Sequence, residues 1–189
     1  MHAGLLMYWN RKVNLTGMAS WDEILLRHYM DSLVPLSMLP PGKLLLDIGS
    51  GAGFPGIPAK ALYPETHVVL CDMKRKKTSF LKTFIAYSGL RNVSVVQASW
   101  ESLLANPESS GIFVSEGYDL IISRALKLTT RDISLILDRG IRDRGALVLW
   151  TGPKALKEAR GNLKGINFEV REYDLLEGLP RAVLIFRKM

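Results

Sequence analysis

A glycine-rich turn is the part of this sequence whose residue types and spacing could do chemistry. It spans residues 49–56 and directly follows an apolar run that ends in Asp47. Its glycines can adopt positive φ and let a ligand approach the backbone, while Pro55 suits the first turn of a helix. The spacing Gly51-x-Gly53-x-x-Gly56 matches the dinucleotide fingerprint, whereas the Gly-Lys-Ser/Thr of a Walker-type phosphate loop is missing.

The acid before the turn indicates which ligand it favours. A carboxylate from Asp47 at the end of the strand would repel a diphosphate, which disfavours a dinucleotide. S-adenosylmethionine fits better, because it has no phosphate and carries an ammonium and a sulfonium group. We therefore expect Asp47 and Gly51 to help bind S-adenosylmethionine, and the alternative is a strand–helix turn that merely needs glycine.

Further polar residues follow the next predicted strands. Asp72 ends the second strand, where doubly wound nucleotide-binding folds keep the acid that accepts hydrogen bonds from ribose hydroxyls. Trp100 and Glu101 follow the third strand, where they could flank and hydrogen-bond an adenine, although Trp100 could equally belong to the core. Arg124 ends the fourth strand, where a single arginine could also be only a local ion-pair partner.

Positive charge is the second chemical feature of the sequence. The chain has 25 Lys and Arg against 18 Asp and Glu, a net charge of +7 and a pI near 9.6, which favours a polyanionic partner such as RNA. The densest run of cations, Lys74-Arg75-Lys76-Lys77, stands where a helix should begin, although the helix dipole disfavours cations there. The candidate RNA contacts are Arg11, Lys12, Arg27, His28, Lys74, Arg75, Lys76 and Lys77.

Alternating strand and helix patterns must position these residues. Apolar runs predict buried strands at 43–47, 67–72, 93–98, 118–124 and 145–150, and helices are expected at 54–62, 76–88, 129–138 and 153–160. This alternation is typical of a parallel sheet with helices on both faces. Two closing strands at 168–175 and 181–188 are too close for a crossover and should form an antiparallel hairpin, while 106–117 is expected to be a surface loop.

The N-terminal part has a helical pattern of its own. Ser20 and Glu23 have the spacing of a capping box. An apolar stripe follows on the same helix and places Arg27 and Asp31 roughly opposite; it consists of Leu25, Tyr29, Leu33 and Leu36. With 189 residues, we expect a single α/β domain, in which a helical segment at 1–42 precedes a doubly wound, Rossmann-like core at 43–189.

Other classes of protein are disfavoured by what the sequence lacks. The single cysteine, Cys71, cannot form an internal disulfide, and the start has no signal-peptide pattern. No apolar run is long enough for a membrane span, so we expect a cytoplasmic protein without membrane contact. Neither a metal-binding Cys/His cluster nor a Ser/His/Asp set can be named from spacing, so the catalytic residues stay unassigned and no metal is expected.

Taken together, several motifs resemble the bacterial glucose-inhibited division protein B family, which are small-subunit ribosomal RNA (guanine-N7) methyltransferases. The resemblance runs from about Trp9 to Trp150. The motifs that carry it are Trp9-Asn10-Arg11-Lys12-x-Asn14-Leu15-Thr16, Arg27-His28-x-x-Asp31-Ser32, Asp47 through Gly56, Asp72 with Lys76-Lys77 and Phe80-Leu81, and Ser123-Arg124-Ala125. The chain departs from the family pattern in a shorter N-terminus, in Arg75 for a usual glycine, and in Thr151 where a lysine is typical.

The resemblance implies a class I methyltransferase fold with a seven-stranded sheet. It also implies S-adenosylmethionine contacts at Gly49, Phe54, Trp100, Glu101 and Arg124. The implied substrate is a guanosine in the 530 loop of 16S ribosomal RNA, methylated at N7, and the implied partner is the small ribosomal subunit. We expect the protein itself to be a monomer. Guanine N7 has a free lone pair, so the transfer needs no general base.

Two other functions stay open at this point. A nicotinamide-dependent oxidoreductase could use the same doubly wound scaffold, but it would need to bind a diphosphate at the turn. A non-catalytic RNA-binding or assembly protein could keep the fold without turnover, which the departures at Thr151 and at the N-terminus would allow.

Overall fold

The structure is a computed structural model that describes residues 1–18, 20–40, 42–110, 114, 116–124, 126–163 and 165–188. Ala125 of the Ser-Arg-Ala motif and parts of the predicted loop at 106–117 lie outside the described residues. In the described ranges, no helix is both long and apolar enough to cross a membrane.

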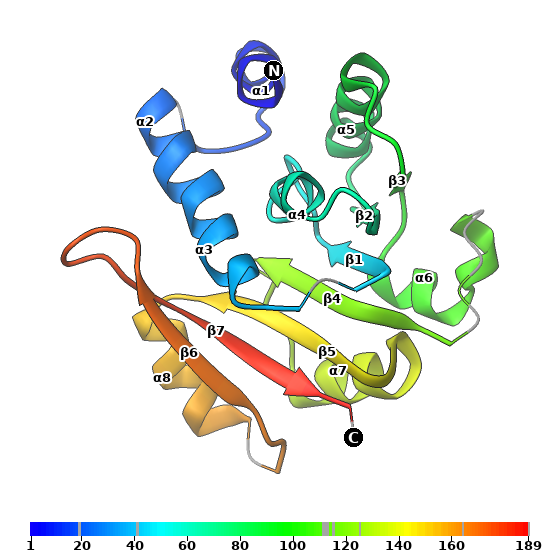
Figure 1. The fold of residues 1–189 in the computed structure, drawn as a ribbon, viewed down its shortest axis with the longest axis vertical. Coiled ribbons are helices and arrows are strands. Elements are labelled where there is room, and N and C mark those ends of the chain that lie inside the picture. The colour runs from blue at the N-terminus through cyan, green and yellow to red at the C-terminus, as the bar shows by residue number, and fades with distance from the viewer. Residues whose placement is uncertain are drawn as a thin grey trace.

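A seven-stranded sheet forms the centre of the molecule, in the order β3-β2-β1-β4-β5-β7-β6 (Figure 1). Strands β1 to β5 pair in parallel, while β7 pairs antiparallel with both β5 and β6. The predicted doubly wound sheet with a closing hairpin is thereby confirmed. The strands are β1 (Leu44–Ile48), β2 (His67–Cys71), β3 (Val93–Val96), β4 (Tyr118–Arg124), β5 (Ile141–Thr151), β6 (Glu169–Asp174) and β7 (Pro180–Arg187).

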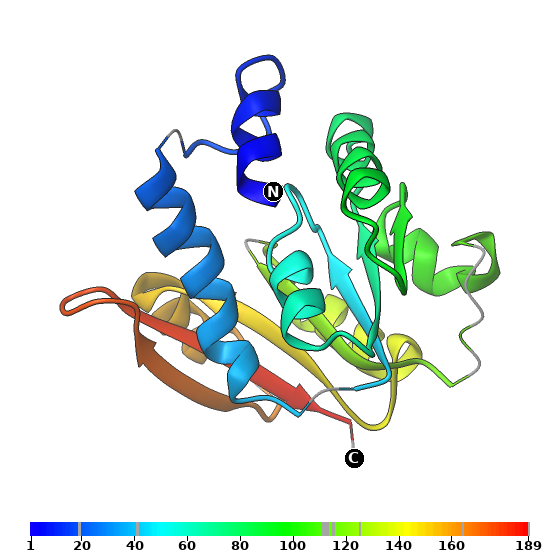
Figure 2. The ribbon, with the colours of Figure 1, turned by 45° about the horizontal axis from the view of Figure 1, so that its top comes forward.

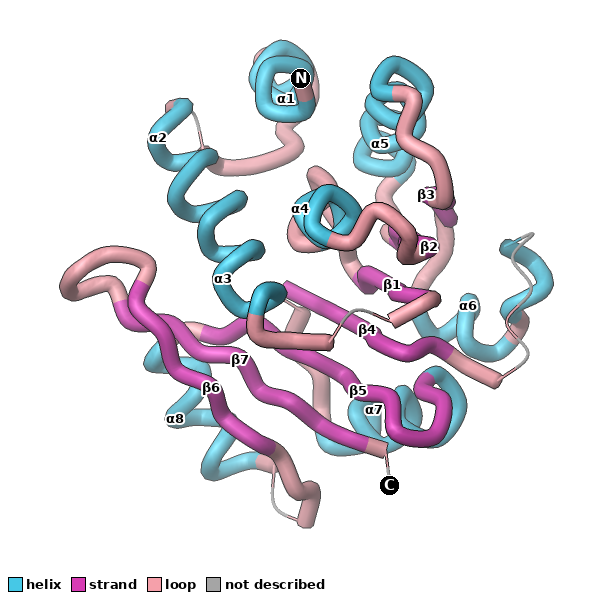
Figure 3. The backbone as a smooth tube through the Cα atoms, viewed as in Figure 1, coloured by secondary structure: helices cyan, strands magenta, loops and turns pink. Residues whose placement is uncertain are grey.

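Helices cover both faces of this sheet (Figure 3). The face that carries α3, α4 and α5 buries one apolar cluster, and the face that carries α6, α7 and α8 buries another. The helical elements are α1 (His2–Asn10), α2 (Trp21–Ile24), the π-helical η1 (Leu25–Met30), α3 (Asp31–Ser37), α4 (Gly56–Leu62), α5 (Arg75–Ser88), α6 (Trp100–Ala105), the 3₁₀ turn η2 (Pro107–Ser110), α7 (Thr130–Leu135), the π-helical η3 (Ile136–Gly140) and α8 (Pro153–Asn162).

Two elements differ from the sequence expectation. Helix α6 was not predicted, because it has only six residues and lacks a full apolar period; Ser99 caps it by accepting a hydrogen bond from the Ser102 amide at 3.1 Å. Strand β5 begins at Ile141 rather than at residue 145, and the start was missed because Arg142, Asp143 and Arg144 are polar and exposed. Neither difference moves the carboxyl ends of the parallel strands.

The N-terminal helices lie against the same face as α4 and α5. Helix α1 lies between the helix formed by α2, η1 and α3 and helix α5 (Figure 2). The rings of Trp9 on α1 and Phe80 on α5 have centroids 5.7 Å apart. The apolar stripe predicted on the helix formed by α2, η1 and α3 is confirmed only in part. Leu36 is fully buried and Tyr29 packs against the core, but Leu25 is 59% exposed while Asp31 is only 2% exposed. The buried face therefore includes the polar side chains of His28 and Asp31 beside apolar ones.

Candidate functional site

A cavity of about 270 Å³ lies beside the glycine-rich turn, at the carboxyl ends of strands β1 to β4. In an open α/β sheet, this edge at the reversal of strand order is where ligands bind. Four of the residues predicted to bind a cofactor line the cavity: Gly49, Asp72, Trp100 and Arg124. The structure therefore brings together residues that are up to 75 positions apart.

The conformation of the glycine turn is fixed by hydrogen bonds to Asp72, which follows strand β2. Gly49 and Gly51 have φ of 74° and 59°, which is a conformation that favours glycine. The Gly51 amide donates to Asp72 Oδ2 at 2.9 Å, and the Lys74 amide donates to Asp72 Oδ1 at 2.8 Å. Asp72 thus fixes both the turn and the start of α5, and each of its oxygens retains a lone pair for a ligand.

Gly49 lines the cavity with bare backbone, and the packing around it has no room for a side chain. A Cβ at this position would lie 3.0 Å from the Leu126 side chain, which lines the same cavity. Trp100, which begins α6, presents an aromatic surface to the cavity. A ribose-accepting carboxylate, an aromatic wall and a bare backbone turn together fit the nucleoside part of S-adenosylmethionine.

Asp47 plays another part than the one expected from the sequence. Its carboxylate is fully buried, its Oδ2 accepts a hydrogen bond from the Gly56 amide at 2.9 Å, and it lines no part of the cavity. Burial raises the pKa of Asp47 to about 7. This acid supports the far end of the turn from behind, so it cannot carry the argument that a diphosphate would be repelled.

Phe54 and His28 also lie behind the turn. Phe54 is buried and its ring stacks on the His28 ring, with centroids 4.4 Å apart. His2 completes this layer from α1 by hydrogen-bonding the Ala52 carbonyl at 2.9 Å. The Phe54 side chain therefore anchors the N-terminal helices to the turn and does not reach the cavity.

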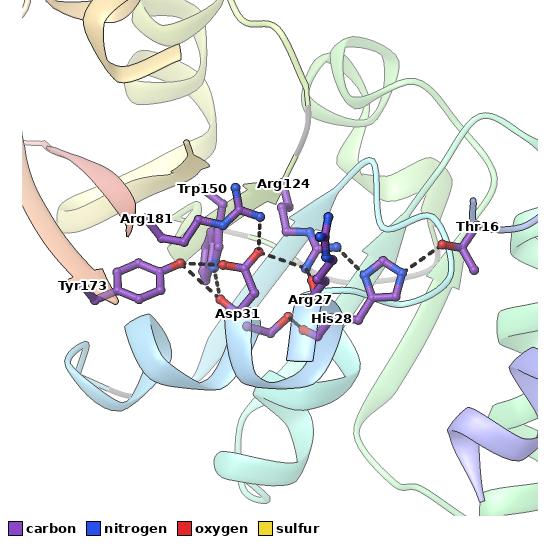
Figure 4. Close-up of polar contacts among 9 residues, drawn as sticks. Thr16, Arg27, His28, Asp31, Arg124, Trp150, Tyr173 and Arg181 are labelled. Carbon is purple, nitrogen blue, oxygen red and sulfur yellow. Dashed lines mark hydrogen bonds and ion pairs between the residues drawn. The ribbon is translucent and has the colours of Figure 1, made fainter. Parts of the chain in front are cut away.

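His28 has no free nitrogen for an RNA phosphate. Its Nδ1 accepts a hydrogen bond from the Arg124 guanidinium, so its Nε2 donates to Thr16 Oγ1 at 2.9 Å (Figure 4). Burial, and in second place the charge of Arg124, lowers the pKa of His28 to about 4. The expectation that His28 contacts RNA is corrected by this burial, because the ring is neutral and 7% exposed.

Arg124 is fixed by an acid from the N-terminal helix. Asp31 Oδ2 lies 3.4 Å from the Arg124 guanidinium and 3.2 Å from that of Arg181. The Tyr173 hydroxyl donates to Asp31 Oδ1 at 2.8 Å, and the Trp150 indole donates to the Asp31 carbonyl at 2.7 Å (Figure 4). We call these five residues, Asp31, Arg124, Trp150, Tyr173 and Arg181, the Asp31 junction.

The remaining predicted site residues are dispersed. Glu101 is exposed in the first turn of α6 and does not line the cavity. Lys77, expected at an RNA surface, lines the cavity with its Nζ 3.8 Å from Asp72 Oδ2, and Lys74 lines it as well. The other candidate RNA contacts are exposed: Arg11, Lys12, Arg27, Arg75 and Lys76.

Sequence reasoning missed most of the Asp31 junction. Asp31 was expected on the face opposite the apolar stripe and as part of a family motif, and Tyr173 and Arg181 belong to the C-terminal hairpin, where the resemblance is weak. A helical acid on the predicted polar face gives no sign that it will be buried. The one available signal was the pairing of Arg27-His28 with Asp31-Ser32 in a single motif.

Comparison with known proteins agrees with this geometry. The sequence profile of the family described as rRNA small subunit methyltransferase G matches residues 2–179 of the chain. The chain belongs to this family. The resemblance drawn from the motifs is confirmed, and membership decides against a nicotinamide-dependent oxidoreductase.

Individual relatives carry the name of the rRNA small subunit methyltransferase G family. The ribosomal RNA small subunit methyltransferase G 1 of Syntrophobacter fumaroxidans is 35% identical over 191 residues, which cover 98% of this chain and 84% of the relative. The protein of Myxococcus xanthus is 34% identical over 97% of this chain and 83% of its own length. A match in Desulfitobacterium hafniense is 44% identical but covers 67% of this chain and half of the relative.

Solved structures confirm the class I methyltransferase fold of this family member. A SAM-dependent methyltransferase from Aquifex aeolicus superposes with a TM-score of 0.61 at 16% identity, covering 88% of this chain and 93% of the other. The precorrin-6y C5,15-methyltransferase of Geobacter metallireducens gives a TM-score of 0.60 at 17% identity, over 93% and 91% of the two chains. At these identities the likeness concerns the fold alone.

Proposed function

We propose that this protein transfers a methyl group from S-adenosylmethionine to N7 of a guanosine in the 530 loop of 16S ribosomal RNA. Methylation of small-subunit ribosomal RNA is the activity named for the relatives. The choice of N7 and of the 530 loop comes from the family resemblance. The single observation that carries the proposal is the cavity beside the glycine turn, where Asp72, Trp100 and Gly49 meet.

The cavity provides what the nucleoside part of the cofactor needs. Asp72 would accept hydrogen bonds from the ribose hydroxyls, Trp100 would lie against the adenine, and the bare Gly49 backbone would admit the ligand. S-adenosylmethionine supplies an activated methyl group on a sulfonium when it is bound.

The groups around the cavity suit a nucleophile that carries no proton. His28 is neutral and both of its nitrogens are bonded, while both Asp72 oxygens accept amide hydrogens. His28 is therefore not free to act as a base for an amino group or a ribose hydroxyl. Guanine N7 needs no base, so the task of the protein reduces to holding the base in line with the methyl group.

RNA binding is assigned to cations near the cavity. Lys74, Arg75 and Lys76 are exposed around the start of α5, and Lys74 also lines the cavity. Arg11, Lys12 and Arg27 add exposed charge from the N-terminal helices. Contacts from such side chains to phosphates should make RNA affinity fall steeply with salt.

Methyl transfer to small subunits purified from cells that lack this protein tests the proposal. With labelled S-adenosylmethionine, we expect the label in 16S RNA as 7-methylguanosine at one position in the 530 loop. Asp72→Asn should lower the transfer, while Asp143→Asn, an exposed acid outside the cavity, should leave it unchanged. Label at another atom or loop would refute the assignment, and RNA binding without turnover would favour the assembly protein.

A further inference from the structure

A second and larger cavity, of about 560 Å³, adjoins the cofactor cavity. It lies at the carboxyl ends of β4 and β5, between the segment that follows Arg124 and helix α8. Arg124 and Leu126 line both cavities, so these two side chains form a common wall. A volume in this range is typical of small-molecule sites, and its position places any occupant directly beside the cofactor.

The lining of the second cavity combines apolar walls with a few polar groups. Leu128, Ile133 and Leu149 contribute apolar surface against which a flat ring can pack. Glu158 and Asn162 lie one helical turn apart on α8 and both line the cavity. Such a combination is how enzymes hold an extruded nucleobase, with stacking on its faces and hydrogen bonds to its edge.

Asp31 offsets part of the positive charge at the common wall. Its Oδ2 lies 3.4 Å from the Arg124 guanidinium and 3.2 Å from that of Arg181, and both arginines line the second cavity. Methylation at N7 makes the guanine cationic, so an acid beside these two cations lowers their repulsion of the product. Arg124 can still donate a hydrogen bond to guanine O6.

Resting on the proposed function, we propose that the second cavity receives the target guanine and that Glu158 reads its Watson–Crick edge. Guanine presents two donors there, N1–H and the 2-amino group, which match the two oxygens of a carboxylate. Adenine instead presents the N1 lone pair to the same carboxylate. Glu158 therefore selects guanine over adenine, and Arg124 holds the O6 edge at the common wall with the cofactor.

Selectivity between guanosine and inosine tests the role of Glu158, because inosine lacks only the 2-amino group. With reconstituted small subunits that carry either base at the target, the wild type should prefer guanosine by roughly tenfold or more in kcat/KM. Glu158→Ala should bring this ratio close to one. The matched control is Glu172→Ala, an exposed acid on β6 that pairs with Arg160 outside the cavity and should keep the ratio.

A binding measurement separates this inference from the proposed function. Saturation-transfer NMR with guanosine and inosine 5′-monophosphate needs no turnover, and the wild type should show the stronger transfer to guanosine. Ala159→Trp, which fills the cavity from α8, should abolish that transfer while calorimetry shows unchanged binding of S-adenosylmethionine. Nucleotide binding without methylation would contradict the proposed function but not the guanine site. Unchanged selectivity in Glu158→Ala, or unchanged nucleotide binding in Ala159→Trp, would overturn the guanine site.

Discussion

Two regions meet at Arg124, and they are built in opposite ways. On one side, the glycine turn is fixed by main-chain amides: those of Gly51 and Lys74 donate to Asp72, which is 21 residues from the first and two from the second. On the other side, the Asp31 junction joins side chains from the N-terminal helix and the C-terminal hairpin. There Asp31 contacts Arg124, Tyr173 and Arg181 across 93, 142 and 150 residues.

This difference determines how each region should respond to mutation. The turn uses backbone donors that any sequence supplies, and its acid lies at the rim of a cavity that water can enter. The junction buries charges that satisfy one another only when three distant segments are packed together. We therefore expect the junction to contribute mainly to stability and the turn mainly to ligand binding.

Asp31→Ala should have the largest effect. It leaves the guanidinium of Arg124 buried without its acid and removes the acceptor of Tyr173, and breaking a buried pair in this way typically costs about 3–5 kcal/mol. Urea denaturation measures the loss. Asp143→Ala, an exposed acid at the start of β5, should change the free energy of unfolding by less than about 0.5 kcal/mol.

Asp72→Ala provides the comparison within the same experiment. Its partners are amides beside an open cavity, where water can replace a lost acceptor, so it should destabilise less than Asp31→Ala. Calorimetry should show the reverse order for ligand binding: Asp72→Ala should lower the affinity for S-adenosylmethionine more than Asp31→Ala does. Equal losses of stability for the two variants would contradict the division between the regions.

The same division explains what could be predicted from the sequence. Runs of apolar residues and the glycine spacing are local signals, so the seven strands and the turn were predicted within a few residues. Gly49, Asp72, Trp100 and Arg124 were correctly expected to meet, because parallel strands bring their carboxyl ends to one edge. Lys77 was misplaced, since spacing along α5 shows neither its direction nor its partner.

The Asp31 junction could not be predicted for a physical reason. Helical periodicity identifies the apolar face of a helix and predicts that an acid on the opposite face is exposed to solvent. Such an acid is buried only when a partner, which can be far away in the sequence, compensates the cost of its burial. Arg181 and Tyr173 are such partners, but the hairpin that carries them has no local feature that points to a helix 142 residues earlier. Glu101 was expected to contact the cofactor, but helix α6, which was not predicted, exposes this acid in its first turn and outside the cavity lining.

The pH dependence of stability should differ in sign between the regions. Next to the junction, His28 accepts a hydrogen bond from Arg124, and its pKa is lowered to about 4 from 6.5, so its contribution is complete above pH 6.5 and is lost as pH falls towards 4. Behind the turn, the pKa of Asp47 is raised to about 7 from 3.8. Its contribution is complete below pH 3.8 and is lost as pH rises through 7.

Unfolding measured from pH 4 to pH 8 resolves the two groups. The difference between wild type and His28→Gln should shrink by up to about 3 kcal/mol as pH falls from 6.5 to 4. The difference between wild type and Asp47→Asn should instead shrink as pH rises from 4 to 8, since the amide still accepts the Gly56 hydrogen bond. A parallel pH dependence in wild type and His28→Gln would refute the neutral, buried histidine.

Lys77 lies beside Asp72 at the cavity, and its substitution should give the smallest of these effects. Its Nζ lies 3.8 Å from Asp72 Oδ2 with a quarter of the side chain exposed, so the ammonium competes with ribose hydroxyls for the same carboxylate. Lys77→Gln removes a partly exposed ion pair, which is worth about 0.2–1 kcal/mol. We therefore expect the variant, free of RNA, to bind S-adenosylmethionine about 1.5- to 5-fold more tightly by calorimetry.

Lys76→Gln is the matched control, because this exposed neighbour removes the same charge from α5 without lining the cavity. Its affinity for S-adenosylmethionine should stay at the wild-type value, and added salt should reduce the gain of Lys77→Gln by weakening the competing ion pair in the wild type. Weaker cofactor binding in Lys77→Gln would instead place the ammonium in contact with the cofactor. The glycine turn would then bind its ligand through a mobile side chain as well as through its backbone and Asp72.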